Sequence, residues 1–382
     1  MIVEIERVAH GGVCVAHAPD GRVVFVRHAL PGEQVRIAVT EERSSYLRAD
    51  AVEILRASPA RVAPPCPYAG PGRCGGCDWQ HASLDEQRRL KAAVVREQLQ
   101  RLAGLEIDVE VEPVPGDRDG LGWRTRLRLA VGPDGRAGLH RHRSHEIEPI
   151  DDCLIAVPAA DIPDVVSRRW PDGAEVNVDV SSAGERALST GTPGRTVTER
   201  AAGREWQVPV GGFWQVHPGA ADVLVATVRE MLVPRADETL LDLYAGVGLF
   251  AGALAPSVRS AIAVESDRRA ARAAAANLAD LAVTVAHARV DAWLRGGHDG
   301  SPVDLVVLDP PRKGAGRDVV TRVAALRPRA IAYVACEPSA LARDLATFAG
   351  LGYALSTLRA FDLFPMTAHV ECVALLEPSP PR

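Results

Sequence analysis

The C-terminal half of the chain alternates short apolar runs with amphipathic stretches. The apolar runs are TLLDLYAG (239–246), SAIAVES (260–266), VDLVVLDPP (303–311) and RAIAYVAC (329–336). Stretches with helical periodicity, such as RRAARAAAANLADL (268–281), separate them. Continuous apolar strands that alternate with helices are typical of a doubly wound parallel sheet. We therefore predict an α/β domain over residues 206–382.

The N-terminal half has a different pattern. Residues 1–57 alternate short apolar runs with turn signals such as PDG and LPGE, which is typical of a small β-barrel. Residues 58–205 begin in a proline-rich stretch, contain an amphipathic helix over 84–102, and are strand-rich after 123. We predict a central β-rich domain over 58–205, with the helix as a candidate to pack on the C-terminal domain.

Composition and charge argue against a secreted, a membrane-spanning or a strongly basic protein. The 382 residues are 47% hydrophobic and 24% charged, with a net charge of -5, so any nucleic-acid surface must be a local patch. The start, MIVEIERVAHGG, lacks the features of a signal peptide, and the longest apolar region is interrupted by glycines. Seven cysteines in such a chain argue against a disulfide framework. We expect a cytoplasmic monomer with reduced thiols and no membrane partner.

The predicted strands end in residues suited to a nucleotide-like cofactor. Gly246 follows the first strand, and Glu265 ends the next one, where a carboxylate can bind the two hydroxyls of a ribose. Asp291 follows the third strand and Asp309 the fourth, in a DPP motif. The glycine spacing is not that of a dinucleotide fingerprint. This pattern favours S-adenosylmethionine over a nicotinamide cofactor.

A lone cysteine, Cys336, lies between a predicted strand and a predicted helix. A thiolate that adds to carbon 6 of a pyrimidine makes carbon 5 nucleophilic enough to accept a methyl group. The helix N-terminus would favour the thiolate. A base must then remove the proton of carbon 5, and on chemistry alone either His369 or Glu371 can serve. Cys372 is expected to point to the opposite face and to belong to the core.

Four further cysteines suggest a metal site. Cys66, Cys74 and Cys77 form a C-x7-C-x2-C pattern in a loop, and Cys153 is the best remaining fourth ligand. Four thiolates suit either zinc or an iron–sulfur cluster. Cys14, in a barrel strand, is expected to be a packing residue.

A local basic patch is predicted in the central region. Arg124, Arg126 and Arg128 alternate along a strand and would share one face, suited to phosphate contacts. The alternative is a solvated, salt-bridged face. Phe213 or Trp214 is a candidate to stack on a flipped base, with a core role as the alternative.

Five motifs together identify a family resemblance. FWQVHP (213–218), LDLYAGVGLF, DPPRKG, YVACEPSALARD (333–344) and HVECVALLEP (369–378) resemble, in this order, the RNA 5-methyluridine methyltransferases. The N-terminal region resembles a TRAM domain. The resemblance implies a Rossmann-like class I methyltransferase domain behind a TRAM/OB-like barrel, and S-adenosylmethionine as methyl donor. It also implies Cys336 as nucleophile, Glu371 as base, and cofactor contacts at Gln215, Tyr244, Glu265 and Asp309.

The resemblance also bears on the cysteines and the substrate. It favours a [4Fe–4S] cluster on Cys66, Cys74, Cys77 and Cys153, and rRNA as the RNA partner, with a tRNA T-loop as the alternative. A non-catalytic iron–sulfur RNA-binding protein is the alternative of another class. The chain departs from the family's usual Ser-Cys-Asn-Pro by placing Glu337 after the cysteine, and Leu249 stands where relatives have Thr or Asn. We expect Glu337 to face outward at the helix start, because a carboxylate turned toward the thiol would disfavour the thiolate.

Overall fold

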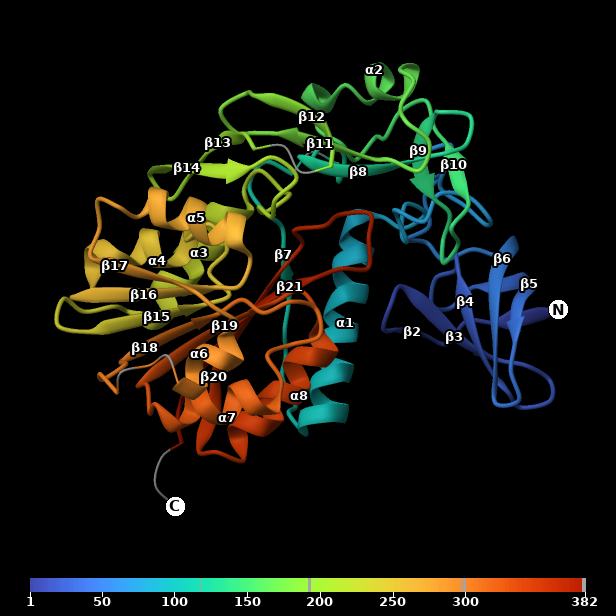
Figure 1. Ribbon diagram of the computed structural model, residues 1–382. Helices are drawn as coiled ribbons and strands as arrows, with labels where there is room; N and C mark the ends of the chain where they lie inside the picture. Colours follow the sequence, from blue (N-terminus) through green and yellow to red (C-terminus); the bar gives the residue numbers. More distant parts are fainter. Residues whose placement is uncertain (118, 192–193, 297, 299, 380–382) are drawn as a thin grey trace. The chain divides into compact units, whose positions relative to one another are not determined.

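The computed structural model describes residues 1–382 apart from 118, 192–193, 297, 299 and 380–382 (Figure 1). The chain forms two compact units. The first comprises Met1–Val94, Asp117–Val176 and Phe364–His369, and the second comprises the remaining segments, Val95–Gly116, Asn177–Leu363 and the C-terminal residues from Val370. Of the helices in the described part of the chain, none is both long and apolar enough to cross a membrane.

A mainly parallel sheet is the centre of the second unit. Its strand order is β17-β16-β15-β18-β19-β21-β20-β7, with β21 antiparallel to both of its neighbours. The strands are β7 (Val111–Glu112), β15 (Thr239–Leu243), β16 (Ser260–Glu265), β17 (Val283–His287), β18 (Leu305–Leu308), β19 (Ala330–Ala335), β20 (Tyr353–Phe361) and β21 (Glu371–Pro378). The strand order reverses between β15 and β18, the point at which such sheets bind ligands. The predicted doubly wound sheet is therefore present.

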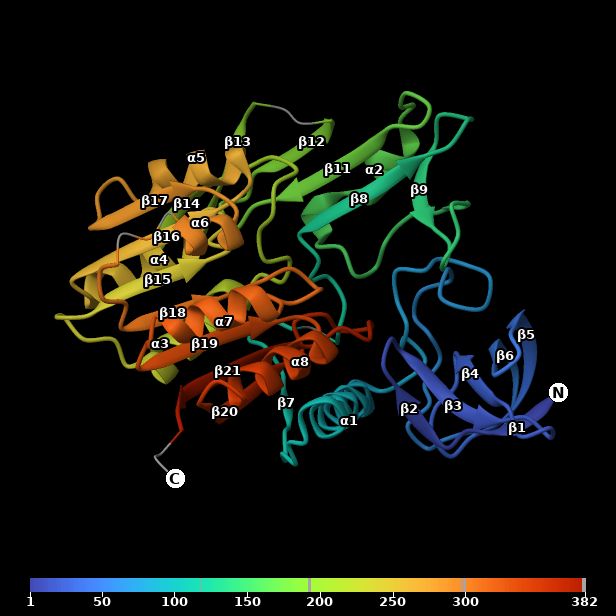
Figure 2. The same cartoon turned by 60° about the horizontal axis from the view of Figure 1, so that its bottom comes forward.

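Helices cover the sheet because each parallel connection must cross one of its faces. The helices are α3 (Ala220–Leu232), α4 (Leu249–Leu254), α5 (Arg268–Asn277), α6 (Val290–Gly296), α7 (Arg317–Ala325) and α8 (Pro338–Ala349), with a 3-10 turn η2 at Ala255–Ser257. Helix α7 contacts both α6 and α8, and Figure 2 shows these three on one face of the sheet. The strands β15, β18 and β19 are buried along their whole length, as their continuous apolar runs predict.

The remaining strands of the second unit precede the parallel sheet in the sequence. They are β12 (Arg186–Thr190) and the antiparallel pair β13 (Thr196–Ala201) and β14 (Arg204–Pro209). β11 (Glu175–Val180) crosses the boundary between the two units, and α1 (Leu84–Ala103) is divided by it at Val94. α1 matches the helix predicted over 84–102.

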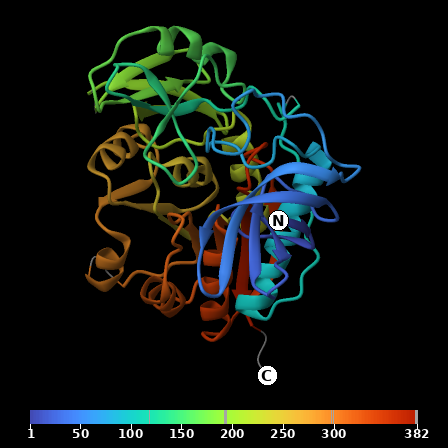
Figure 3. The same cartoon turned by 90° about the vertical axis from the view of Figure 1, so that its right-hand side faces the viewer.

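The first unit begins with a curled β-sheet, drawn in blue in Figure 3. The order β1-β5-β6-β4-β3-β2 is formed by β1 (Ile2–Glu4), β2 (Arg7–Ala9), β3 (Val13–His17), β4 (Val23–Arg27), β5 (Gln34–Glu42) and β6 (Tyr46–Arg56). Alternate side chains of these strands, including Val24, Val26 and Ile37, form one apolar core. Cys14 lies in this core, as predicted, and burial raises the pKa of its thiol to about 12. This thiol is a packing group.

The rest of the first unit is built around a small antiparallel sheet. The sheet has the strand order β10-β9-β8-β11-β12, and the strands β8 (Arg126–Val131), β9 (Ala137–His140) and β10 (Ile147–Pro149) belong wholly to this unit. A 3-10 turn η1 (Pro158–Ala160) and the helix α2 (Ile162–Ser167) follow β10 in the sequence. The predicted boundaries at 57 and 205 stay predictions.

A buried ion pair attaches the segment after the barrel to the barrel itself. Glu33 is fully buried, and Arg61 donates to both of its carboxylate oxygens at 2.5 and 2.7 Å. The amides of Leu30 and Ser58 donate to the same carboxylate. Burial alone would raise the pKa of Glu33, but these hydrogen bonds and the Arg61 charge hold it below its usual value.

Removing this carboxylate is expected to destabilise the first unit strongly. Glu33→Ala leaves the Arg61 cation with little solvent access, and we expect the free energy of unfolding to fall by about 3–5 kcal/mol in urea denaturation at neutral pH. Because the folded pKa is lowered, the ionised pair stabilises above the ordinary glutamate pKa. The loss should therefore shrink as the pH falls through the folded pKa.

An exposed pair on the same barrel provides the control. Glu53 contacts Arg36 at 2.6 Å with about half of each side chain exposed, so Glu53→Ala should cost less than about 1 kcal/mol. Equal losses for the two variants would contradict the role given to Glu33.

Candidate active site

Three cofactor candidates lie at one edge of the parallel sheet. The ends of β15, β16 and β18 are paired in register across the sheet. Tyr244 follows β15, Glu265 is the last residue of β16, and Asp309 follows β18. Because carboxyl ends of parallel strands share one edge, the register brings together three groups that are far apart in the sequence.

The loop after β15 passes close to Glu265. Gly246 has φ +56° and Gly248 has φ +96°, a left-handed backbone that glycine adopts without strain. The amide of Gly246 donates to Glu265 Oε2 at 2.9 Å. A Cβ on Gly246 would meet no atom within 4 Å, so the backbone here borders open space. This loop can admit a ligand against its backbone.

Asp242 is a site residue that the sequence analysis missed. It lies within the otherwise apolar strand β15, is fully buried, and its Oδ2 accepts a hydrogen bond from the amide of Ala251 at 2.8 Å. Burial raises the pKa of Asp242 to about 7, and burial together with the Asp242 charge does the same for Asp309. The sequence signal that could have identified Asp242 is its position as the one acid within an apolar strand. Its carboxylate fixes the first turn of α4 behind the glycine loop.

The other cofactor candidates differ in their surroundings. Gln215 is buried in the segment between β14 and α3. Tyr244 is half-buried with φ +65°, and burial raises its pKa to about 12. Asp291 lies in the first turn of α6, where its carboxylate forms ion pairs with Arg289, at 3.0 Å, and Arg295. A ligand at Asp291 would therefore have to share or displace these cations.

Cys336 and Glu371 lie opposite each other. In the antiparallel pair β19–β21, Ala335 is the partner of Cys372. Extending this register by one residue places Cys336 across from Glu371, and opposed residues of antiparallel strands project from the same face. Cys372 is fully buried, as predicted. The insertion of β21 beside β19 thus brings the predicted nucleophile and base together.

His369, the other candidate base, does not share this arrangement. β21 begins at Glu371, so the alternation of strand side chains does not extend to His369. Its ring stacks edge-on against Phe364, with ring centroids 5.9 Å apart, inside the first unit. The geometry of the strand pair therefore favours Glu371.

The expected activation of the Cys336 thiol by the helix is corrected by the structure. Burial, together with the charges of Glu371, Asp309 and Glu337, raises the pKa of Cys336 to about 12. The charge of Arg312 acts in the opposite direction and lowers it. Desolvation of the sulfur thus outweighs the effect of the helix N-terminus. In the free protein at neutral pH this thiol is protonated.

The carboxylate of Glu337 caps the N-terminus of α8. Glu337 is the N-cap, and its Oε1 accepts from the amide and the hydroxyl of Ser339 at 3.3 and 3.0 Å. An acid at this position satisfies an orphan helix amide. Its charge contributes less to the pKa of Cys336 than the charge of Glu371 does.

Arg312 is the second residue that the sequence analysis missed. It follows Asp309-Pro310-Pro311 and its charge lowers the pKa of both Cys336 and Glu371. Burial and the Asp309 charge otherwise raise the pKa of Glu371 well above its usual value. The DPPRKG motif contained the signal, because an arginine after the two prolines can oppose the carboxylates around it.

The four candidate ligand cysteines all lie in the first unit. They are Cys66, Cys74, Cys77 and Cys153. Burial together with neighbouring cysteines raises the pKa of Cys77 to about 12 and of Cys153 to about 11. The thiols are therefore near one another. Within the residues that the structure describes, however, no three His, Cys, Asp or Glu side chains are placed to hold one metal ion. The donor set suits a thiolate-bound group, but the geometry is not that of a closed site.

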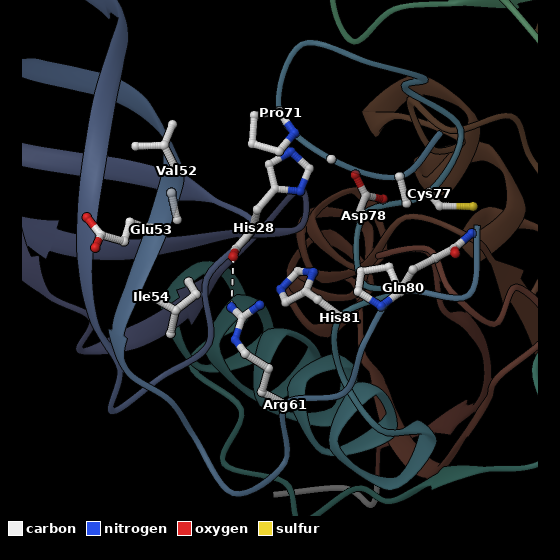
Figure 4. Close-up of a pocket in the computed structure, with 14 residues that line it drawn as sticks. His28, Val52, Glu53, Ile54, Arg61, Pro71, Cys77, Asp78, Gln80 and His81 are labelled. Atoms are coloured by element: carbon white, nitrogen blue, oxygen red, sulfur yellow. Dashed lines mark hydrogen bonds between the residues drawn. The ribbon is translucent and has the colours of Figure 1, made fainter. Parts of the chain in front are cut away.

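A pocket of about 180 Å³ lies between β6 and the cysteine loop. Figure 4 shows the Cys77 and Gln80 side chains on the side of this pocket away from Val52. Burial lowers the pKa of His28 to about 3 and of His81 to about 4, so both imidazoles are neutral at neutral pH. These histidines add no cation beside the cysteines.

The prediction that Arg124, Arg126 and Arg128 share one exposed face is wrong. Arg126 is buried, and Arg128 forms an exposed ion pair with Glu175 at 3.6 Å. The charge of Arg124 lowers the pKa of Cys153 and of Cys74, so its guanidinium lies near the cysteines. The strand turns Arg126 into the core because β8 is covered on both faces for most of its length. These three arginines do not form one open phosphate-binding face.

The aromatic pair before Gln215 divides into one exposed and one buried ring. Phe213 is 70% exposed, whereas Trp214 is buried and lies 6.3 Å from the ring of Trp206. Phe213 is the one with a surface available for stacking.

Comparison with known proteins connects this geometry to a family. Residues 1–52 match the model of the TRAM domain, and residues 215–349 match the model described as conserved hypothetical protein 95. An uncharacterized RNA methyltransferase of Streptomyces coelicolor is 50% identical, covering 99% of this chain and 92% of that protein. The 23S rRNA (uracil(1939)-C(5))-methyltransferase RlmD of Pseudomonas fluorescens is 33% identical, with the same coverage of both chains. The chain belongs to the family of RNA uracil-C5 methyltransferases.

The methyltransferase also has a structural relative along its whole length. The crystal structure of Pyrococcus abyssi tRNA (uracil-54, C5)-methyltransferase with S-adenosyl-L-homocysteine matches 98% of this chain and 100% of that chain, with a TM-score of 0.72 and 23% identity. This likeness confirms the predicted fold, a TRAM domain followed by a Rossmann-like methyltransferase domain. The enzyme is an RNA methyltransferase, as its motifs predicted.

Proposed function

We propose that this enzyme methylates carbon 5 of a uridine in RNA, with Cys336 as nucleophile and Glu371 as general base. The observation that carries the proposal is the register of β19 and β21, which pairs Ala335 with Cys372; continued by one residue, it brings Cys336 next to Glu371 at the carboxyl edge of the sheet. The Glu371 charge also acts more strongly on the Cys336 thiol than the other charges around it. Bound S-adenosylmethionine would supply the methyl group. Gln215, Tyr244, Gly246, Glu265, Asp291 and Asp309 are the proposed residues that hold it.

The proposed chemistry needs both groups in their ionised form. The Cys336 thiolate adds to carbon 6, and the electrons of the carbon 5–carbon 6 double bond make carbon 5 nucleophilic. After carbon 5 has been methylated, the Glu371 carboxylate removes its proton, the double bond reforms, and the sulfur–carbon 6 bond breaks. Burial opposes ionisation of both groups, and the Arg312 charge favours it in both. Arg312 is thus proposed to support both steps.

The proposed substrate is a uridine of 23S rRNA. The curated relatives at 32–33% identity that act on this RNA support it. A base inside a helix must be flipped out to reach the half-buried Cys336 thiol, and the exposed ring of Phe213 is suited to stack on it.

A labelling assay tests this function. The enzyme is incubated with tritium-labelled S-adenosylmethionine and unmodified 23S rRNA or tRNA, and the RNA is digested to nucleosides. We expect labelled 5-methyluridine from the rRNA. Label in tRNA alone would overturn the rRNA target, and no labelled 5-methyluridine from either RNA would overturn the function.

We further propose that Cys66, Cys74, Cys77 and Cys153 bind a [4Fe–4S] cluster. Neighbouring thiols raise the pKa of Cys74, Cys77 and Cys153, and the Arg124 charge opposes this for Cys74 and Cys153, which supports a site that gathers thiolates. A bound cluster would take the deprotonated thiols as ligands.

Metal analysis of anaerobically purified protein checks the cluster. We expect iron and acid-labile sulfide in equal amounts, and loss of both in Cys77→Ala, because one missing ligand opens the site. Cys14→Ala, which alters a cysteine of the barrel core, should retain both. Zinc without sulfide in the unaltered protein would contradict the cluster and favour a zinc site.

A further inference from the structure

We infer that Tyr333 and Asp344 are positioning residues, which hold the segment 309–316 and its residues Asp309 and Arg312 beside the Cys336 thiol. This inference rests on the proposed role of Cys336. The segment connects β18 to α7 and contains the DPPRKG motif. Neither Tyr333 nor Asp344 touches the reacting atoms in the proposed chemistry.

One buried carboxylate ties three elements together. Asp344 of α8 accepts a hydrogen bond from the Tyr333 hydroxyl of β19 at 2.6 Å. The same oxygen, Oδ2, accepts from the amides of Ala315 at 2.8 Å and Gly316 at 3.2 Å. The amide of Ala315 also donates to the Tyr333 hydroxyl at 3.1 Å. Tyr333 is fully buried and Asp344 is 5% exposed, so water does not compete for these bonds.

The Asp344 carboxylate leaves no room for a side chain at the glycine of the DPPRKG motif. Gly314 has φ +86°, and a Cβ there would lie 2.7 Å from Asp344 Oδ2. Contacts this short do not occur for real side chains, so any larger residue would displace the carboxylate or the segment. The segment and the carboxylate therefore approach as closely as the backbone allows.

The position of this network relates it to the nucleophile. Tyr333 precedes Cys336 by three residues in β19, and Asp344 follows it in α8, so the network holds both flanks of the cysteine. Arg312 precedes Ala315 by three residues. The tie at Ala315 and Gly316 therefore limits how far Arg312 can move away from the thiol.

The charges that face Cys336 come from three directions. Glu371 belongs to β21, Glu337 begins α8, and Asp309 and Arg312 belong to the tied segment. The three carboxylates oppose the thiolate and Arg312 favours it. Of the two charges on the segment, Arg312 acts on the thiol more strongly than Asp309 does, so releasing the segment weakens the net charge that helps ionise the thiol. The nucleophile then becomes less reactive.

Two variants and a matched control test the inference. Tyr333→Phe removes one hydroxyl and keeps the buried ring, and Asp344→Asn removes the charge and keeps the shape. Tyr353→Phe removes another buried tyrosine hydroxyl, which donates to the carbonyl of Pro328 at 2.8 Å instead of to this segment. The control therefore loses a similar hydrogen bond without releasing the segment.

The measured quantity is the rate at which iodoacetamide alkylates Cys336, followed by mass spectrometry at neutral and alkaline pH. We expect Tyr333→Phe and Asp344→Asn to react about tenfold more slowly, the effect of about one pKa unit, and Tyr353→Phe to react like the unaltered enzyme. kcat for methylation should fall with the alkylation rate while KM for RNA stays unchanged.

The sign of the change separates positioning from a merely structural role. A loosened structure would expose the thiol and speed alkylation, so faster reaction in Tyr333→Phe would overturn the inference, as would a rate equal to that of Tyr353→Phe. Alkylation needs no RNA. A failure of the unaltered enzyme to form 5-methyluridine would therefore overturn the proposed function separately, without deciding the positioning result.

Discussion

Cys336→Ala is expected to lower the methylation rate by on the order of 10⁴-fold or more, because the proposed addition to carbon 6 of the uracil needs the thiolate of this residue. Cys336 directly follows β19, and the charge of Glu371 at the start of β21 acts on its thiol. In RNA substituted with 5-fluorouridine, carbon 5 has no proton to lose, so the unaltered enzyme should remain attached to the RNA. The measurement is a denaturant-resistant protein–RNA complex on a gel.

Cys372→Ala is the matched control for this prediction. Cys372 is the next residue along β21 from Glu371 and is fully buried on the opposite face. Its replacement should lower stability, because a small cavity is left in the core, but it should leave complex formation intact. A complex that persists in Cys336→Ala would contradict the assignment of the nucleophile.

Glu371→Gln is expected to trap the enzyme on ordinary RNA. The amide cannot accept the carbon 5 proton, so the sulfur–carbon 6 bond formed by Cys336 cannot break after methylation. We expect turnover to fall by about 10³-fold, the usual contribution of a general base. A denaturant-resistant complex that carries the labelled methyl group should accumulate with natural uridine RNA.

Glu377→Gln, at an exposed position of the same strand, should turn over normally and accumulate no complex. Loss of turnover in Glu371→Gln without a labelled complex would place Glu371 before methyl transfer and contradict its role as the base. Undiminished turnover in this variant would contradict any catalytic role.

The electrostatics of the site explain why both groups matter together. Glu371 is buried and Cys336 is half-buried, and together they would carry two negative charges if both ionised. Burial and the surrounding carboxylates raise the pKa of Cys336 to about 12, burial raises the pKa of Glu371 well above its usual value, and the Arg312 charge lowers both. The hydrogen bonds of Tyr333 and Asp344 would therefore assist the reaction, because they keep the Arg312 charge close to both groups.

Much of the fold and part of the site could be predicted from the sequence, because the relevant signals are local. A strand buried on both faces is almost continuously apolar, so β15, β18 and β19 stand out as apolar runs, which in β15 only Asp242 interrupts between the leucines. Glycines and acids at the ends of such strands must meet at one edge of a parallel sheet. Gly246, Glu265 and Asp309 were found for this reason.

Tertiary structure alone decided the features that depend on neighbours distant in the sequence. The pairing of Cys336 with Glu371 exists because β21 inserts beside β19, and alternation within one strand could not choose between Glu371 and His369. Arg126 is buried because the strand is covered on both faces, which strand alternation does not reveal. The raised pKa of the Cys336 thiol arises from desolvation by several elements at once. The local sequence pattern thus determined which helices and strands form and which reactive side chains they carry. Tertiary packing decided which side chains come together and how their pKa values shift, because burial and charge act through space between residues distant in the sequence.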